Sequence, residues 1–315
     1  MGIQHSAFSI QHSAFGVRPA SVAGGFYPAT AKEVDLALDE MFPEQPSVGT
    51  HEARVPPPQP EPWAAVMVPH AGWRYSGRLA ASVLSRVEIP GQVIILCPKH
   101  GPGGADWAVA PHASWSLPGR QVDSDPELAR RLAEGIAGLE LDEAPHRREH
   151  AIEVQLPLLA RLAPHARVVG ITIGGGELAS LLRFGQQMAE VLGDQPSVGT
   201  HEAWVPPGTL RVRRPLLVIS SDMSHIEGYA DNEAEAHRLD RLALEAMQTL
   251  DPARLYETVR SHRISMCGMR PAVIVMETLR QWGRLQRCEL VGYTTSAESG
   301  GGTDRVVGYA GMLLG

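Results

Sequence analysis

Short apolar runs alternate along the chain with longer segments in which apolar residues recur at helical spacing. The apolar runs predict strands over Ala64–Val68, Val93–Leu96, Val168–Ile173, Leu216–Ser220, Cys288–Thr295 and Val306–Leu313. The amphipathic segments predict helices over Ala31–Met41, Ser76–Arg86, Asp125–Ala133, Ile152–Leu162, Glu177–Leu192, Asn232–Met247, Pro252–Arg260 and Pro271–Trp282. Strands that alternate with helices indicate an α/β fold, here a three-layer sandwich around a central mixed, largely parallel sheet.

Three local features refine this expectation. Ser76 is expected to cap its helix, and Pro157 to make the 152–162 helix irregular. Trp107–Ala110 and Ser114–Leu117 are expected to form short edge strands on either side of a turn.

Two verbatim repeats interrupt the alternation. Ile3–Phe8 recurs at Ile10–Phe15, and Gln45–Ala53 recurs at Gln195–Ala203 in stretches rich in Pro, Gly, Ser and Thr. Such stretches are typical of exposed loops, where added length costs little closure entropy. We therefore expect a disordered tail over 1–16 and a single domain over 17–315, with inserted loops at 44–60 and 194–210.

Composition limits the class of protein. Of the 315 residues 43% are hydrophobic, and no apolar stretch approaches the roughly 20 residues that span a bilayer. The sparse, odd set of Cys97, Cys267 and Cys288 argues against a disulfide framework and favours a reducing compartment. A net charge of −7 disfavours a general nucleic-acid-binding protein. Since residues 1–15 do not resemble a secretory signal, we expect a cytoplasmic protein that binds neither membrane nor nucleic acid.

Residues capable of chemistry gather in six short segments, several of them where predicted strands end. Pro69-His70-Ala71-Gly72-Trp73 follows one strand, and Pro98-Lys99-His100-Gly101 follows the next. Ligands of open α/β sheets bind outside the carboxyl ends of the strands. The two histidines therefore predict a shared metal site, the alternative being that each merely caps a strand end. Lys99 either keeps His100 neutral by charge repulsion or is simply solvated.

Two further segments pair a histidine with a carboxylate three residues away. His150 and Glu153 stand at a helix start, so that their side chains are expected to share a face; the alternative is that Glu153 helps to cap the helix. Asp222 and His225 follow Ser220-Ser221 at the end of a strand. A buried aspartate orients an imidazole and raises its basicity, which suits a general base, whereas a surface ion pair is the alternative.

The fifth segment, Met266-Cys267-Gly268, stands at the entry to a predicted helix, and the sixth is the glycine run ending at Asp304. A thiol near a helix start is expected to have a lowered pKa, which favours a ligand or nucleophile, although a buried inert cysteine is also consistent with the sequence. Cys97 and Cys288 lie in apolar strands and are expected to be structural. Seven other histidines have no comparable sequence context and are expected at the surface: His5, His12, His112, His146, His165, His237 and His262.

Rival catalytic patterns are missing from the sequence. It contains no phosphate-binding GxxxxGK[ST], no GxGxxG after a first strand and no GxSxG nucleophile motif.

The ordered set of segments resembles the Memo-like family, also called AmmeMemoRadiSam system protein B. The resemblance covers about 18–314 and begins with Arg18-Pro19-Ala20-Ser21-Val22-Ala23-Gly24-Gly25-Phe26-Tyr27-Pro28. It continues through the segments at His70, His100, His150, Asp222 and Cys267 and ends with Val307-Gly308-Tyr309-Ala310. Ala151, Met266, Met269 and Lys99 depart from the family pattern without altering the matching ligand positions.

The resemblance implies a fold similar to the class III extradiol dioxygenases, with a metal in a pocket beside the central sheet. It implies His70, His100 and Cys267 as metal ligands and Asp222 and His225 as residues that line the pocket. Iron(II) is the first expectation for the metal and copper the second. The family name also implies a functional association with a radical-SAM protein and an AMMECR-type protein.

Three hypotheses follow. The first is a metal-dependent, dioxygenase-like oxidoreductase in which His225, oriented by Asp222, is the base and His150 and Glu153 tune the surroundings of the metal. The second is a non-catalytic module that uses the same pocket to recognise a peptide or small anion. The third, a metal-free nucleophile pair of Cys267 and His225, leaves His70 and His100 without a role.

Overall fold

The computed structural model describes residues 16–42, 59–193 and 214–315 of the chain. The predicted tail at 1–16 and the predicted inserted loops at 44–60 and 194–210 lie almost entirely outside these residues.

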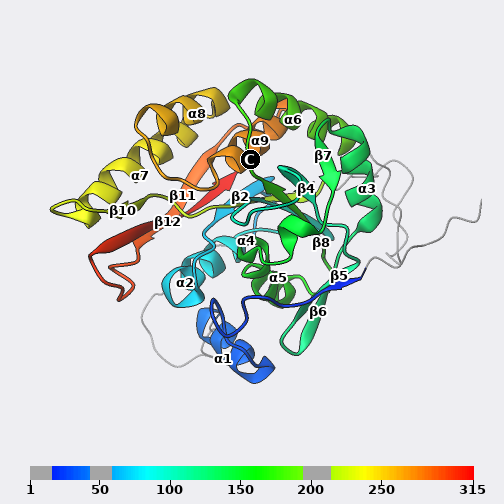
Figure 1. Cartoon of the computed structure of the whole chain (residues 1–315), viewed down its shortest axis with the longest axis horizontal. Helices are drawn as coiled ribbons and strands as arrows, with labels where there is room; N and C mark the ends of the chain where they lie inside the picture. The colour runs from blue at the N-terminus through cyan, green and yellow to red at the C-terminus, as the bar shows by residue number, and fades with distance from the viewer. Residues whose placement is uncertain (1–15, 43–58, 194–213) are drawn as a thin grey trace, which may run out of the picture.

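A mixed sheet of nine strands forms the centre of the described part of the molecule (Figure 1). Its strands are, in order, β10 (His225–Glu227), β12 (Arg305–Leu314), β2 (Ala65–Val68), β9 (Leu216–Ser220), β3 (Gln92–Pro98), β8 (Arg167–Ile173), β4 (Trp107–Val109) and β7 (Leu139–Leu141), with β11 (Cys288–Thr295) paired to β12. The central strands β2, β9, β3 and β8 are mutually parallel, and the antiparallel pairings lie toward the two edges. The expected α/β fold with a mixed sheet and a parallel centre is confirmed.

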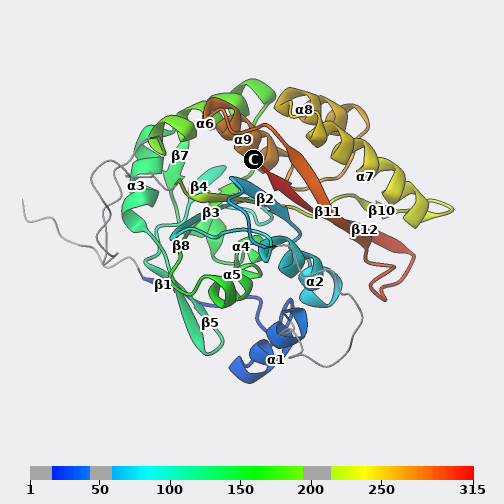
Figure 2. The same cartoon turned by 180° about the vertical axis from the view of Figure 1, so that it is seen from behind.

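Helices cover both faces of this sheet (Figures 1 and 2). The helices α3 (Pro126–Gly135), α6 (Leu178–Val191), α7 (Asn232–Gln248), α8 (Pro252–Ser261) and α9 (Met269–Gln281) share one hydrophobic cluster with the sheet. The opposite cluster joins the sheet to α1 (Ala31–Met41), α2 (Trp73–Leu84), α4 (His150–Glu153) and α5 (Leu156–Leu162). Side chains alternate between the two clusters along each strand, as Met67 and Val68 do, because successive residues of a strand face opposite sides.

Two predicted helices differ from their expected form. The helix expected from Ser76 begins at Trp73, after Gly72. The Trp73 ring is buried, and its indole nitrogen donates to the Val154 carbonyl at 2.9 Å, so tertiary packing fixes the earlier start. Ser76 does not cap the helix; its hydroxyl donates to the Ala71 carbonyl. The helix expected over 152–162 is two helices, with Pro157 in the first turn of α5, where its missing N–H costs no helical hydrogen bond.

The two expected short strands both form, but the expectation that they lie at sheet edges is wrong. β4 lies inside the main sheet between β8 and β7, whereas β5 (Ser114–Leu117) belongs to a separate three-stranded sheet with β1 (Val17–Arg18) and β6 (Arg120–Asp123). The strands β1, β6, β7 and β10 were not expected, because they are too short and polar for an alternating pattern to mark them. A short 3₁₀ helix over Ala144–His146 was also missed.

None of the helices in the described ranges combines the length and apolar composition that crossing a bilayer requires.

Candidate metal centre

Three parallel strands deliver the site to one edge of the sheet. In the register, Val68 of β2 lies beside Ser220 of β9, and Ile219 of β9 lies beside Leu96 of β3. The residues just beyond these strands therefore meet at their carboxyl ends, where His70 and His100 stand. The predicted convergence of the two strand-end histidines on one place is what the structure shows.

Cys267 reaches the same edge from the start of α9, which packs on these strands. Gly268, the residue that follows it, donates its backbone N–H to Ser221 Oγ at 2.9 Å. A side chain at position 268 would place its Cβ only 2.3 Å from the Cβ of Ser221. The close approach that carries the thiol to the strand ends therefore requires glycine at this position.

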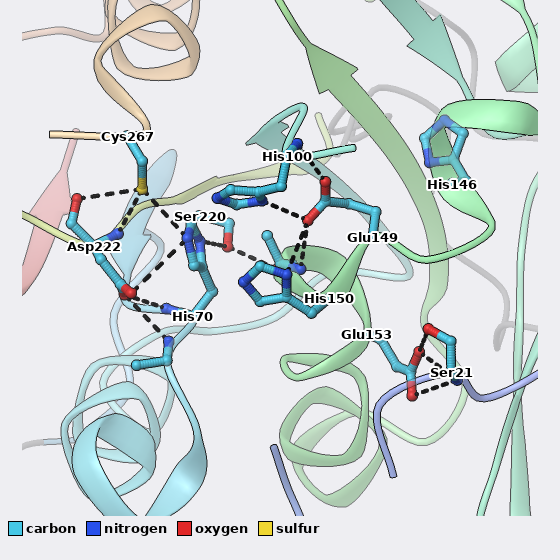
Figure 3. A network of polar contacts seen from close by, with 12 residues as sticks. Ser21, His70, His100, His146, Glu149, His150, Glu153, Ser220, Asp222 and Cys267 are labelled. Carbon is cyan, nitrogen blue, oxygen red and sulfur yellow. Dashed lines mark hydrogen bonds and ion pairs between the residues drawn. The ribbon is translucent and has the colours of Figure 1, made fainter. Parts of the chain in front are cut away.

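The donor atoms of His70, His100 and Cys267 all lie within 4.8 Å of one another. Cys267 Sγ is 3.3 Å from His70 Nε2, and the rings of His70 and His100 have centroids 5.1 Å apart (Figure 3). These three residues, the His-His-Cys cluster, come from three different segments and converge on one point. A metal ion that accepts nitrogen and sulfur ligands fits such a donor set.

Hydrogen bonds at Nδ1 fix the tautomers of both histidines. The Ser220 hydroxyl donates to the Ala151 carbonyl at 2.7 Å, so its oxygen accepts from His70 Nδ1–H at 3.0 Å. His100 Nδ1 lies 2.8 Å from a carboxylate oxygen of Glu149, which requires His100 to carry its proton there. Each ring then keeps the lone pair of Nε2 free for a metal, the arrangement that orients histidine ligands in metal sites.

Glu149 is the functional residue that the sequence analysis missed. Its buried carboxylate also accepts the backbone N–H groups of His100 at 2.9 Å and Ala151 at 3.0 Å. Burial by itself raises the pKa of Glu149, but the hydrogen bonds from His100 and Ala151 outweigh it and hold the pKa at about 2. The Glu149 carboxylate is therefore ionised where it accepts the hydrogen bond from His100. Its position just before His150, as the N-cap of α4, was the available signal.

Burial and neighbouring imidazoles keep His70 and His150 neutral. Burial, with a smaller effect of His100, lowers the pKa of His70 to about 3. Burial, with a smaller effect of His70, lowers the pKa of His150 to about 4. Neutral imidazoles can coordinate a metal without first losing a proton.

The expectation of a lowered pKa for Cys267 is wrong. Burial raises the pKa of this thiol well above its usual value, and the nearby Asp222 carboxylate adds to the shift. The hydrogen bonds that lower it, such as the one from Asp222 N–H to Sγ at 3.2 Å, are too few to compensate. Without a cation nearby, Cys267 is a protonated thiol.

His150 and Glu153 do not face the same way. The His150 ring lies against those of His70 and His100, with centroids 5.3 and 4.5 Å away. Figure 3 shows Glu153 directed away from these rings toward Ser21. Its fully buried carboxylate pairs with Arg18 and accepts hydrogen bonds from Ser21 and Val22 backbone N–H groups and the Tyr27 hydroxyl. The structure thus places His150 beside the His-His-Cys cluster and Glu153 in a neighbouring structural network.

Asp222 and His225 also contact different groups. Asp222 Oδ1 accepts the backbone N–H groups of His70 at 2.8 Å and Ala71 at 3.2 Å. Burial raises the pKa of Asp222, against the lowering effect of these N–H groups. Among the hydrogen bonds of the described residues, none joins Asp222 to the half-buried ring of His225, whose backbone N–H donates to Ser265 Oγ. Asp222 therefore holds the backbone of a candidate ligand, and the expected orientation of His225 by Asp222 is not seen.

Three other expectations need correction. Lys99 is neither solvated nor directed at His100; its ammonium donates to the carbonyls of Gly104 and Ala105. His146 and His112 are buried, at 0% and 7% exposure, and do not lie on the surface. Their rings pack near Trp115, which a sequence search for strand-end histidines cannot detect. His165 and His262 are exposed as expected.

The sheet and the His-His-Cys cluster define an α/β protein with a candidate metal site at the carboxyl edge of its parallel strands. The model of the family described as Memo-like protein matches residues 18–313, and the chain belongs to this family.

Relatives of similar length support this assignment. A MEMO1 family protein of Aquifex aeolicus (strain VF5) is 32% identical over 299 residues, covering 95% of this chain and 99% of the relative. A MEMO1 family protein of Ignicoccus hospitalis is 33% identical over 300 residues, covering 94% and 98%. A solved structure of an uncharacterized protein, JW3007, from Escherichia coli K12 is similar in fold alone, with 12% identity and a TM-score of 0.53 over 80% of this chain and 99% of that chain.

Proposed function

We propose that this Memo-like protein is a metal-dependent oxidoreductase of the dioxygenase-like kind, with the metal bound by His70, His100 and Cys267. The observation that carries the proposal is the convergence of two free Nε2 lone pairs and a thiol within 4.8 Å of one another. The proposed likeness to the class III extradiol dioxygenases agrees with the position of the cluster beside the carboxyl ends of a parallel sheet.

We propose iron(II) as the metal and copper as the second candidate. Imidazole nitrogens suit iron and copper, and a thiolate adds a soft anionic ligand that copper also accepts. The buried carboxylates of Glu149 and Asp222 next to the cluster compensate the positive charge of an ion better than an apolar lining would. A metal bound here supplies a redox-active Lewis acid, and three protein ligands leave positions for other molecules.

Hydrogen bonds from the surrounding residues hold the proposed ligands in position. Ser220 and Glu149 hold the two ligand rings by their Nδ1 atoms, which limits how far each Nε2 can move. Asp222 holds the backbone of the first ligand and donates its own N–H to the thiol sulfur. His225, half-buried at the start of β10, remains our proposed base for a phenol-like substrate.

A binding module that recognises a peptide or small anion remains the second candidate, because a fold does not establish turnover. Oxygen consumption in the presence of catechol-type compounds separates the two. Iron-loaded protein is expected to consume oxygen only with a substrate present, and the His225→Gln variant, with metal still bound, is expected to consume much less. Metal-loaded protein that consumes no oxygen with any such compound would favour the binding module.

The structure opposes the metal-free nucleophile pair. The Cys267 thiol lies 3.3 Å from Nε2 of His70, and burial raises its pKa. Among the hydrogen bonds of the described residues, none joins this thiol to His225. A pair of this kind predicts iodoacetamide labelling of Cys267 that added metal leaves unchanged, whereas metal ligation predicts protection.

Metal binding near neutral pH is expected to release the proton of the Cys267 thiol, because burial keeps this proton on the sulfur of the metal-free protein and the thiol must ionise to ligate. A pH indicator in weakly buffered solution measures the release during an anaerobic titration with iron(II). The Cys267→Ala variant should release about one proton fewer per ion. Equal release from parent and variant would show that the thiol does not ligate.

The association with a radical-SAM protein and an AMMECR-type protein stays a prediction of the family resemblance. Co-purification with such proteins from cells that encode them would test it.

A further inference from the structure

A further group of side chains that could bind a metal lies near β11 and β12. Glu233 and His237 come from α7, and Glu298 comes from the connection between β11 and β12. Their donor atoms lie within 4.8 Å of one another. Figures 1 and 2 show α7 running alongside β11 and β12, so that the helix and the connection lie together. We call these three residues the outer cluster.

The helix α7 and the packing around it fix the positions of Glu233 and His237. Glu233 and His237 are four residues apart on α7, which places them on one face of the helix. The His237 ring packs on Tyr293 with centroids 5.1 Å apart, and the Tyr293 hydroxyl is held by Asp240 at 2.7 Å. The imidazole is therefore supported by a fixed aromatic surface.

Each carboxylate of the outer cluster is anchored through one oxygen only. Glu233 Oε1 accepts from the Thr295 hydroxyl at 2.9 Å. Glu298 Oε2 accepts from the Thr294 hydroxyl and the Thr295 backbone N–H, both at 2.9 Å. Glu298 Oε1 is left 3.9 Å from His237 Nε2, and Glu233 Oε2 has no hydrogen bond among the described residues. Hydrogen bonds at one oxygen thus orient each carboxylate while its second oxygen stays available for a ligand.

Within the part of the chain that the structure describes, the two carboxylates lack a permanently charged partner. Within the described residues, no lysine or arginine forms an ion pair with Glu233 or Glu298. The nearest arginine in the helix sequence, Arg238, is occupied by a two-point pair with Glu235. Two carboxylates held this close repel each other, and a bound cation removes that repulsion.

We propose that Glu233, His237 and Glu298 form a second metal site. This site binds Zn²⁺ without using any ligand of the His-His-Cys cluster. One imidazole and two carboxylates with a water molecule complete a tetrahedral zinc site. Magnesium and calcium prefer oxygen ligands alone, so the histidine favours zinc over them.

A zinc ion bound by these three residues would link α7 to the connection between β11 and β12. Glu298 and Ser299 line a groove of about 810 Å³ together with Phe26 and Trp73. The Ser299 hydroxyl donates to the Tyr75 carbonyl of α2 at 3.0 Å. A zinc ion at the outer cluster would therefore fix one wall of this groove.

Zinc titration of the full-length chain carrying His70→Ala and Cys267→Ala tests the proposal independently of the proposed function, since these variants remove ligands of the His-His-Cys cluster. Competition with a chromophoric chelator is expected to show about one equivalent of zinc. Adding His237→Ala should abolish this uptake, and adding Glu298→Gln instead should weaken it by at least tenfold. Adding His262→Ala, at the exposed end of α8, is the matched control and should change nothing.

Failure of the double variant to bind zinc, or uptake that survives His237→Ala, would overturn the proposal. If the double variant does not fold, cobalt titration of the parent replaces it. A thiolate-to-cobalt absorption band marks the Cys267 centre. A second equivalent, bound without that band and lost in the single variant His237→Ala, is the expected result; its persistence in that variant would contradict the proposal.

Discussion

Replacing Glu149 with glutamine is expected to weaken metal binding by about 10–100-fold, because Glu149 orients a ligand rather than ligating in our proposal. The carboxylate accepts from His100 Nδ1 at 2.8 Å and from His100 N–H at 2.9 Å. An amide has one oxygen for these donors, so its NH₂ group would face one of them. The His100 ring then loses the partner that keeps the proton on Nδ1 and the lone pair on Nε2. Competition against a chelator of known affinity measures the change.

Glu143→Gln is the matched control for this experiment. Glu143 lies on the same segment, but its side chain is 52% exposed and pairs with Arg147 at the surface. Its substitution should leave metal affinity unchanged, since exposed ion pairs contribute little. Equal affinities for the parent and the Glu149→Gln variant would contradict the role that we assign to Glu149.

Replacing Arg18 with methionine is expected to lower the free energy of unfolding by about 3–5 kcal/mol, because the substitution leaves the Glu153 carboxylate buried without its counter-ion. Both side chains are buried. The guanidinium also donates to the carbonyls of His146 at 3.1 Å and Glu149 at 2.8 Å, so Arg18 supports the segment that carries two residues of the centre. Urea denaturation at neutral pH measures the loss.

The pH dependence of this loss has a defined sign. In the parent, burial raises the pKa of Glu153, but Arg18 and the surrounding donors outweigh it and lower the pKa below its usual value. The pair therefore stabilises the fold above the unfolded pKa, and this contribution is lost as the pH falls through the lowered pKa. In the variant burial dominates, so protonation relieves the stranded charge. The difference in stability between parent and variant should shrink as the pH falls.

Two further variants make this prediction specific. Adding Glu153→Gln to Arg18→Met should recover part of the lost stability, because it removes the unpaired charge. Arg120→Met breaks a surface pair with Asp35 and should cost less than about 1 kcal/mol. A loss of that small size in Arg18→Met would show that the buried pair does not stabilise the protein.

The strands at the centre of the fold could be predicted because their apolar runs are continuous and buried. β9 and β11 have the bounds that their sequence patterns predict, and α1 agrees as well, since Thr30 and Glu33 form a capping box visible in the sequence. The start of α2 could not be predicted, because it depends on the buried position of Trp73.

The position of the site could be predicted from the ends of the strands, but the hydrogen-bond and ion-pair partners of its residues could not. His70 and His100 were found because parallel strands end at one edge. Glu153 shares a short segment with His150, yet its partner Arg18 is 135 residues away in the sequence. Spacing along a helix cannot reveal such a partner. Glu149 was passed over for the same reason, since its contact with His100 also spans distant segments.

Metal analysis of the full-length protein, purified without chelator and reloaded anaerobically with iron(II), tests whether His70, His100 and Cys267 bind a metal. The parent is expected to bind about one equivalent of iron at the His-His-Cys cluster, and the His70→Ala/Cys267→Ala variant is expected to lose it. Retained fold in the variant is checked by circular dichroism. Equal iron content in the folded variant and the parent would contradict the assignment of His70, His100 and Cys267 as the metal ligands.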